Sequence, residues 1–577
     1  MRNLRGTRHS LPNRRKLTVI AQDPSVKVDG KILTSEVDIP AEELLPGPCG
    51  YRVNVIDFDA STNALYRPAR IDMGKATTYE DPFSRHAKRF RGKSKAYNAA
   101  LMEDPRFHQQ NVYAIVMRTL ARFEFALGRR VAWGSDGHQL HIAPHAFAEA
   151  NAFYSRADRG IFFGYFVGYS GNTIFTSLAH DVVAHETTHA LLDGLRSRYM
   201  EPSSPDQAAF HEGFADVVAL LSIFSLPDVV SKLLDLGTKK RGPLIDTKFL
   251  TRAALEESAL LGLAEQMGQE LSRVRGEALR RSVKLVRGKP YRRMPEYQEP
   301  HARGELLVAA MMNSFIDIWL SRLAKIGTLA RGKKDRSLVV EQGAAVADHL
   351  LSMSIRALDY CPPTDITFPD YLSALLTIDR EIVPDDSKYG YRKALLENFR
   401  AYDIGHADDA GPDGTWSRWE GELVYSRSHF DSMLRDKEEV ARFLWENQRA
   451  FELHPDAYIQ VESVRPCSRI GPDGFILRET VAEYVQLMTL TAGELRAALK
   501  IKPPPEMART ERVRIYGGGA LVFDEYGQLK YQIRNCIEDA DRQTDRLRYL
   551  WETGYFDQPP PDPGSHFARM HLARAGL

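Results

Sequence analysis

Residues 181–192 read DVVAHETTHALL, so that His185 and His189 lie four positions apart and Glu186 directly follows the first histidine. On a helix of about 3.6 residues per turn, positions four apart share one face, so both imidazoles can reach one metal ion. Glu186 could then reach a water molecule bound to that ion. The same five-residue pattern also occurs by chance in unrelated proteins, so a metal site here requires a third ligand.

The stretch 204–216, SPDQAAFHEGFAD, offers that ligand. Ser204, followed by proline and then glutamine, predicts a helix start, and the helix places Glu212 and Asp216 four apart on one face. Two histidines with a glutamate form a catalytic zinc arrangement, so Glu212 is the predicted ligand. Asp216 is predicted to accept the free ring N–H of a ligand histidine. His211 is a rival ligand, but it lies about 100° round the helix from Glu212.

A solvated helix face is the simplest explanation for two acids at this spacing. The residues around Glu212 and Asp216 are mostly apolar, however, and this predicts a largely buried helix. A buried carboxylate needs a partner, which favours the metal-site interpretation.

Together the two stretches resemble the thermolysin-like zinc endopeptidases, the gluzincins. Residues 181–185 are similar to the family's Asp-Val-Val-Ala-His segment, and residues 151–154 to its Asn-Ala-Phe-aromatic substrate strand. His301 and the apolar stretch after it resemble the segment that carries the family's transition-state histidine. Residues 367–404 resemble its C-terminal helical end. The resemblance covers about residues 104–405.

This resemblance implies an endopeptidase that hydrolyses peptide bonds and takes a polypeptide as its partner. One zinc ion per chain is expected, held by His185, His189 and Glu212. Glu186 is the expected general base, which takes a proton from the attacking water. Asp216 is expected behind the ligands, orienting one of the histidines.

The family also implies residues that bind substrate. Its matching asparagine side chain and alanine carbonyl hold the substrate backbone, so Asn151 and Ala152 are expected to do the same. The alternative is that Asn151 is an ordinary polar strand residue. A peptide could add to an edge strand here by main-chain hydrogen bonds. Val182 resembles a residue of the family's apolar specificity pocket, which implies a hydrophobic residue just after the cut.

Two residues are expected to stabilise the oxyanion of the transition state. They are Tyr199 and His301, each displaced by one position relative to the family's pattern. Arg292 and Arg293 are both candidates for an arginine that contacts the substrate carbonyl, and the sequence does not choose between them.

The family's double calcium site has no complete counterpart. Asp181 matches one of its acids, but the position eleven residues after Glu212 is Ile223, where the family has an acid. Calcium takes six to eight oxygen ligands and isoleucine offers none. Calcium is therefore not expected as a cofactor.

Composition restricts the class of protein. With 577 residues the chain exceeds one compact core, so two or more domains are expected. The formal charge of +1 gives no indication of nucleic acid or membrane as a partner. Four scattered cysteines form neither a disulfide framework nor a metal knuckle. The first sixteen residues are basic and precede no apolar segment, which predicts a flexible arm and a cytoplasmic location, whereas the family is typically secreted.

The expected fold class is α+β. We expect these segments in chain order: a basic arm (1–16), a thermolysin-like domain (17–405) made of a β-rich N-terminal lobe (17–195) and a helical lobe (196–405), a linker (406–414), and an α+β region of unknown role (415–577). The basic stretch 76–103 is predicted to be a loop or exposed helix and not a nucleic-acid patch.

Local patterns predict further elements. His138, His141 and His145 look like a metal cluster, but alternation and a proline favour an extended segment with non-ligand histidines. A strand is expected over 151–169. In the C-terminal region helices are expected over 437–451 and 538–549, and strands over 512–516, 520–524 and 529–533. No Lys-Ser/Thr pair follows the glycines at 517–519, which predicts a bulge or bend and not a phosphate loop.

Two rival functions differ from an endopeptidase in what they require. An aminopeptidase-type gluzincin would need an acidic anchor for the substrate amine, such as a Gly-x-Met-x-Asn segment carries, and the sequence has none. A non-catalytic zinc-containing scaffold, acting through the C-terminal region, would need the ligands but not the base. The presence of Glu186 favours an enzyme.

Overall fold

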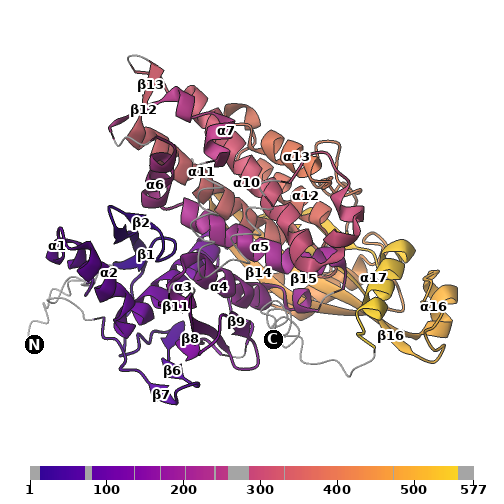
Figure 1. Cartoon of the computed structure of the whole chain (residues 1–577). Coiled ribbons are helices and arrows are strands. Elements are labelled where there is room, and N and C mark those ends of the chain that lie inside the picture. The colour runs from indigo at the N-terminus through magenta and orange to yellow at the C-terminus, as the bar shows by residue number, and fades with distance from the viewer. Residues whose placement is uncertain are drawn as a thin grey trace, which may run out of the picture.

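The structure is a computed structural model. It describes residues 13–71, 81–135, 137–168, 171–201, 203–238, 242–257, 282, 285–329, 332–471 and 474–556. The chain is a mixed α+β protein. A strand-rich N-terminal part, a central body of helices and a C-terminal sheet follow one another along the chain (Figure 1).

The N-terminal part holds short strands and three helices. Its elements are β1 (Arg14–Ile20), β2 (Lys27–Val28), β3 (Lys31–Ile32), β4 (Thr34–Pro40), β5 (Val53–Val55), β6 (Phe58–Asp59), β7 (Ala64–Leu65), α1 (His86–Arg89), α2 (Ser94–Met102), α3 (Pro105–Leu127), β8 (Leu140–Phe147), β9 (Ala152–Ser155), β10 (Gly160–Val167) and β11 (Thr173–Phe175). Residues 1–12 of the predicted basic arm lie outside the described residues. The arm ends earlier than predicted, because Arg14 already pairs with Pro40 in β1 and β4.

One five-stranded sheet lies next to the predicted metal site. Its order is β11-β10-β8-β5, and β9 pairs with β10 at the edge. The single strand predicted over 151–169 is therefore two antiparallel strands. A turn separates them, in which Arg159 has φ 52°. The charged residues of 156–159 and the glycine at 160 interrupt the apolar pattern at this turn.

The central body begins with the two helices of the predicted site, and its helices continue to residue 401. They are α4 (His180–Leu195), α5 (Pro205–Phe224), α6 (Pro227–Thr238), α7 (Arg252–Leu255), α10 (Pro300–Lys325), α11 (Arg336–Ala357), α12 (Phe368–Ile382) and α13 (Tyr391–Ala401), with the short strands β12 (Leu244–Asp246) and β13 (Lys333–Asp335) among them. The predicted start of α5 is confirmed: the Ser204 side chain accepts a hydrogen bond from the backbone N–H of Gln207 at 3.1 Å.

Helix α10 is long and apolar enough to cross a membrane by length and composition. Of its most apolar 18-residue window, 78% is buried inside the structure, as in the core helix of a soluble protein. It packs against α5, α11 and α13.

Helices α5 and α10 cross at two glycines. A Cβ atom on Gly213 would lie 2.9 Å from the carbonyl oxygen of Gly304, and a Cβ atom on Gly304 would lie 3.2 Å from the carbonyl oxygen of Ala209. The backbones approach this closely only because neither position carries a side chain. Gly213 directly follows Glu212, and Gly304 is one turn after His301, so the crossing brings these two residues together.

Gly213→Ala is expected to lower the free energy of unfolding by about 1–3 kcal/mol, the usual cost of overpacking. The added methyl meets a backbone oxygen that no side-chain rotation can move. Denaturant unfolding measures the change. Gly327→Ala is the control, because nothing lies within 4 Å of its new Cβ. Equal stability of the two variants would contradict the role of the crossing.

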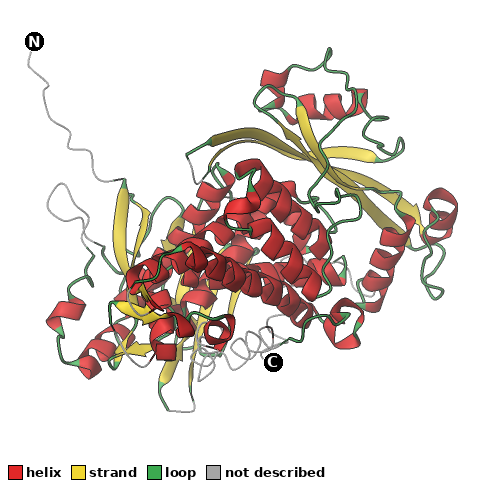
Figure 2. Cartoon of the chain, turned by 90° about the horizontal axis from the view of Figure 1, so that it is seen from above, coloured by secondary structure: helices red, strands yellow, loops and turns green. Residues whose placement is uncertain are grey.

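The C-terminal part is a four-stranded antiparallel sheet with helices around it. Its elements are α14 (Phe430–Met433), α15 (Lys437–Glu446), β14 (Tyr458–Ile470), β15 (Ile476–Thr491), α16 (Ala492–Leu499), β16 (Arg512–Phe523), β17 (Leu529–Asn535) and α17 (Ala540–Glu552). The sheet order is β14-β15-β16-β17. Figure 2 shows its long strands curving alongside the central helices.

The sequence missed the two longest strands, β14 and β15, and divided β16 in two. Strand β16 runs through the three glycines without a break, paired with β15 on one side. A Cβ on Gly518 would lie 2.3 Å from the Tyr484 carbonyl oxygen, and one on Gly519 would lie 2.6 Å from that of Ile533. The glycines therefore let the strands approach closely, in place of the predicted bulge or bend.

The C-terminal sheet shares its core with the central helices. Val481, Val522 and Tyr531 belong to the same buried cluster as the helices α4, α5 and α10. Their neighbours Ala482 and Leu521 point the other way, to a second cluster that α14 and α15 cover. Both faces of the sheet are thus buried.

Buried ion pairs also join the sheet to the helices. Arg469 is fully buried and pairs with both Asp359 and Glu479. Arg129 donates to both carboxylate oxygens of Asp359, at 2.6 and 2.7 Å. Burial alone would raise the pKa of Asp359, but the two arginines lower it well below its usual value.

Residues 406–414 do not separate two independent bodies. Ala407 is buried and its N–H donates to Ser373 at 3.0 Å. The chain then turns back to Trp416, whose N–H donates to Thr377 at 2.7 Å. The predicted linker is a loop held against α12.

Candidate metal centre

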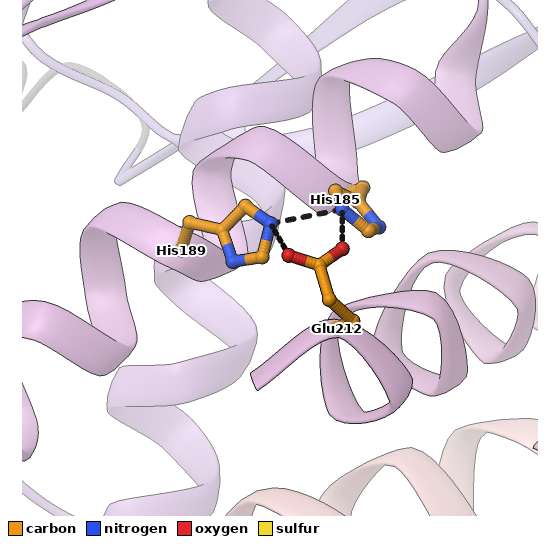
Figure 3. A group of neighbouring side chains, drawn as sticks. All are labelled: His185, His189 and Glu212. Atoms are coloured by element: carbon orange, nitrogen blue, oxygen red, sulfur yellow. Dashed lines mark hydrogen bonds and ion pairs between the residues drawn. The ribbon is translucent and has the colours of Figure 1, made fainter. Parts of the chain in front are cut away.

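Helices α4 and α5 bring the three predicted ligands together. Nε2 of His185 lies 2.9 Å from Nε2 of His189. The carboxylate of Glu212 faces both rings, with Oε2 at 3.5 Å from His185 Nε2 and Oε1 at 3.7 Å from His189 Nε2 (Figure 3). All three side chains are buried. Among the described residues this is the only group of three or more His, Cys, Asp or Glu residues that could hold a metal ion.

Asp216 lies behind the first ligand, as predicted. Its Oδ1 is 2.8 Å from Nδ1 of His185. A carboxylate at Nδ1 keeps the proton on that nitrogen, so Nε2 has its lone pair on the side of the ring that faces Glu212 and His189, where a metal ion could accept it. The Asp216 side chain is 35% exposed, so the site approaches solvent here.

Asp216→Asn is expected to weaken metal binding by about 10–100-fold, because the amide no longer fixes the His185 ring as a carboxylate does. Metal titration of the purified protein measures this. Asp541→Asn, at an exposed position on α17, is the control. An unchanged titration for Asp216→Asn would remove it from this role.

Glu186, the predicted general base, lies on the same helix as the two histidines. It follows His185 on α4 and is fully buried. Val182, one turn earlier, is also buried, at the side of α4 that enters the core.

His301 is brought to the cluster from the first turn of α10. Its Nε2 lies 3.8 Å from Oε2 of Glu212. On the other side of the ring, Nδ1 is 2.6 Å from Oε1 of Glu299. Burial would raise the pKa of Glu299, but hydrogen bonds from the His301 ring and from the amides of His301 and Ala302 lower it to about 2.

His301 Nε2 is therefore aimed at the cluster. This atom is buried and makes no hydrogen bond within the described part of the chain. The one-residue displacement seen in the sequence does not prevent the histidine from reaching Glu212.

Tyr199 requires a correction. Its side chain is completely buried, and its hydroxyl donates to the carbonyl of Pro362 at 2.6 Å. Burial raises its pKa well above the usual 10. The hydroxyl is committed to the backbone of the helical body, so it is not free to donate to an oxyanion.

The two candidate arginines also differ. Arg292 pairs with buried Asp206 at 2.7 Å, and Arg303 holds the other oxygen of the same carboxylate. Arg293 is exposed. Arg292 thus supports the N-terminal end of α5. Within the described residues, no hydrogen bond or ion pair joins Arg292 or Arg293 to the three candidate ligands.

Asn151 and Ala152 lie at the start of the edge strand β9, which packs against α4. Gly164 N–H donates to the Asn151 carbonyl at 2.8 Å, which marks this as a hydrogen-bonded position of the ladder, although the Asn151 N–H itself donates to the Glu149 carbonyl at 2.9 Å. In an antiparallel ladder such pairs alternate, and the backbone groups of Ala152 and Tyr154 therefore point away from β10. The Ala152 amide accordingly bonds the Asn151 side chain, at 2.8 Å.

His211 and the other predicted non-ligand histidines lie outside the metal group. The His211 ring stacks on His189 with a centroid distance of 4.7 Å. His145 is buried in β8 and contacts Asp57 through Nδ1 at 2.8 Å and His108 through Nε2 at 2.7 Å. Burial lowers the pKa of His108 to about 3. Nothing in the sequence indicates this hydrogen-bonded group of Asp57, His145 and His108, because its members are far apart along the polypeptide.

No model of a known protein family matches the chain, and no curated protein matches it.

Proposed function

We propose that this protein is a zinc-dependent endopeptidase of the thermolysin-like kind, acting on extended polypeptide segments. The observation that carries the proposal is the convergence of His185, His189 and Glu212, with Asp216 behind His185. Glu186 follows His185 directly in the sequence. A scaffold that only bound metal would need no glutamate next to its first histidine.

The donor set fits zinc. Two imidazole nitrogens and one carboxylate are the ligands of catalytic zinc sites that keep a fourth position open. Tetrahedral ligands at about 2.0–2.1 Å from zinc lie about 3.4 Å from one another. The separations here are 2.9, 3.5 and 3.7 Å. Bound in such a site, zinc lowers the pKa of a coordinated water towards about 7 and polarises a carbonyl.

The residues of the chain have separate tasks in the reaction. Glu186 accepts the proton of the attacking water and returns it to the leaving amine. His301, held through Nδ1 by Glu299, is placed to donate from Nε2 to the developing oxyanion.

Strand β9 supplies a place for the substrate. The outward carbonyl of Ala152 and the outward backbone groups of Tyr154 can pair with an extended peptide, which would then lie alongside α4. The thermolysin-like assignment of Asn151 as a substrate contact belongs to the same proposal. Calcium independence also remains a prediction: Ile223 is fully buried, and its side chain offers no oxygen.

The experiment is cleavage of a peptide library by the purified protein. We expect internal cuts, loss of cutting after a chelator, and recovery when zinc is restored. Cuts only at the amino terminus would indicate an aminopeptidase. A protein that contains zinc but cleaves no peptide would favour the non-catalytic scaffold.

A further inference from the structure

Helix α4 carries a third polar residue on the face of its two histidines. Asp193 follows His189 by four positions, as His189 follows His185. The three side chains therefore lie one above another along one side of the helix. Asp193 is 2% exposed, and a buried carboxylate needs partners.

Its partners come from the edge strand. The hydroxyl of Tyr154 donates to Asp193 Oδ2 at 2.8 Å, and Nη1 of Arg156 lies 3.5 Å from Oδ1. Positions two apart in an extended chain point to the same side, so β9 presents both groups to α4 together. Each oxygen of the carboxylate thus faces a side chain from the substrate strand or the residue just after it.

A second segment closes over the same carboxylate. Gly134 passes so near that a Cβ atom there would lie 2.1 Å from Asp193 Oδ2. Its carbonyl oxygen accepts a hydrogen bond from Nε of Arg156 at 3.1 Å. Arg156 is thereby fixed between Gly134 and Asp193, and this keeps the end of β9 against the helix.

Tyr154 has two functions at this point. Its side chain reaches inward to Asp193, while its backbone N–H and carbonyl point to the outer edge, away from β10. Whatever fixes the side chain also fixes the position of these backbone groups relative to the metal ligands on α4.

We infer that Asp193 is a positioning residue: through Tyr154 it sets the distance between the outer edge of β9 and the metal cluster. The ligand class that depends on it is an extended peptide long enough to pair with β9. A short substrate that touches only the cluster does not depend on it. This inference rests on the proposed function.

The test is Tyr154→Phe, which removes the hydroxyl and keeps the ring. Its control is Tyr165→Phe in the neighbouring strand β10. Tyr165 donates to Asp59 Oδ2, also at 2.8 Å, and this bond does not involve α4. Both variants are assayed on a blocked eight-residue peptide and on a blocked dipeptide with the same scissile bond. Zinc content and melting temperature are measured alongside.

For Tyr154→Phe we expect KM for the long peptide to rise about tenfold, with kcat within about threefold of wild type. A hydrogen bond to a charged group is worth about that factor in binding. KM for the dipeptide should not change, and Tyr165→Phe should match wild type on both substrates.

A purely structural bond would change both substrates alike, and that result would overturn the inference, as would a Tyr154→Phe enzyme identical to wild type. A wild-type protein that cleaves neither substrate contradicts the proposed function itself. If the wild-type protein is active and Tyr154→Phe has the same KM for the long peptide, only the inference about Asp193 fails.

Discussion

Glu186→Gln should keep its metal and lose nearly all hydrolysis. The three ligands and Asp216 are untouched, so metal binding survives. The amide of glutamine has almost the same shape as the carboxylate but cannot take a proton from water. General base catalysis contributes about 10²–10⁴-fold to a rate, and a loss of at least this size is expected.

Metal analysis and a peptide cleavage assay on the same sample measure the two halves of this prediction. Glu341→Gln, at an exposed position on α11, controls for the change of residue type. Substantial turnover by Glu186→Gln would contradict the mechanism. If the variant loses both its metal and its activity, Glu186 is needed for metal binding and its role as a base is not tested separately.

Glu483→Gln should destabilise the whole protein by about 3–5 kcal/mol, the usual cost of leaving one partner of a buried ion pair alone. Glu483 lies on β15 and pairs with Arg196, which is 2% exposed and directly follows α4. Arg196 also donates to the carbonyl of Leu358. The neutral glutamine leaves the buried guanidinium without a counter-charge.

Denaturant unfolding measures this loss, and metal titration measures its effect on α4. Glu446→Gln is the control: it breaks the Arg427–Glu446 pair, in which the arginine is 65% exposed, and should cost less than about 1 kcal/mol. Equal costs for the two variants would show that the pair at Arg196 does not hold the sheet to the helices.

The centre of the site could be predicted from sequence because its geometry is local. His185 and His189 share a helix face by their spacing, and Glu212 and Asp216 do the same on a second helix. Only the approach of the two helices is non-local. Glycine at positions 213 and 304 allows the neighbouring α5–α10 crossing. Neither segment by itself predicts that the two helices pack against each other.

Tyr199 shows the limit of matching positions to a pattern. Tyr199 lies in a short 3-10 helix, where a displacement of one residue rotates a side chain by about 120°. Here its hydroxyl faces Pro362 inside the helical body. His301 had the same displacement and still reaches Glu212. It does so because α10 begins just before it, with Glu299 capping the helix and holding the ring.

Strands β14 and β15 were missed for a different reason. Charged residues interrupt the alternation of β15, because Glu479 and Glu483 point inward with Val481. Their partners are arginines and a lysine elsewhere in the fold. A charged residue predicts an exposed position unless its buried partner is known. The sequence pattern therefore did not predict that β15 is a buried strand.

The pairing of Arg196 with Glu483 also sets an order of events during translation. All three candidate metal ligands have been added to the chain once Glu212 is made, yet the anchor at the end of α4 does not exist until Glu483 follows. At roughly 5–20 residues per second this interval is on the order of 15–50 s. A half-made chain would carry every ligand on a helix whose end is still loose. The candidate metal site is therefore expected to reach its final form only after Glu483 has been added to the chain.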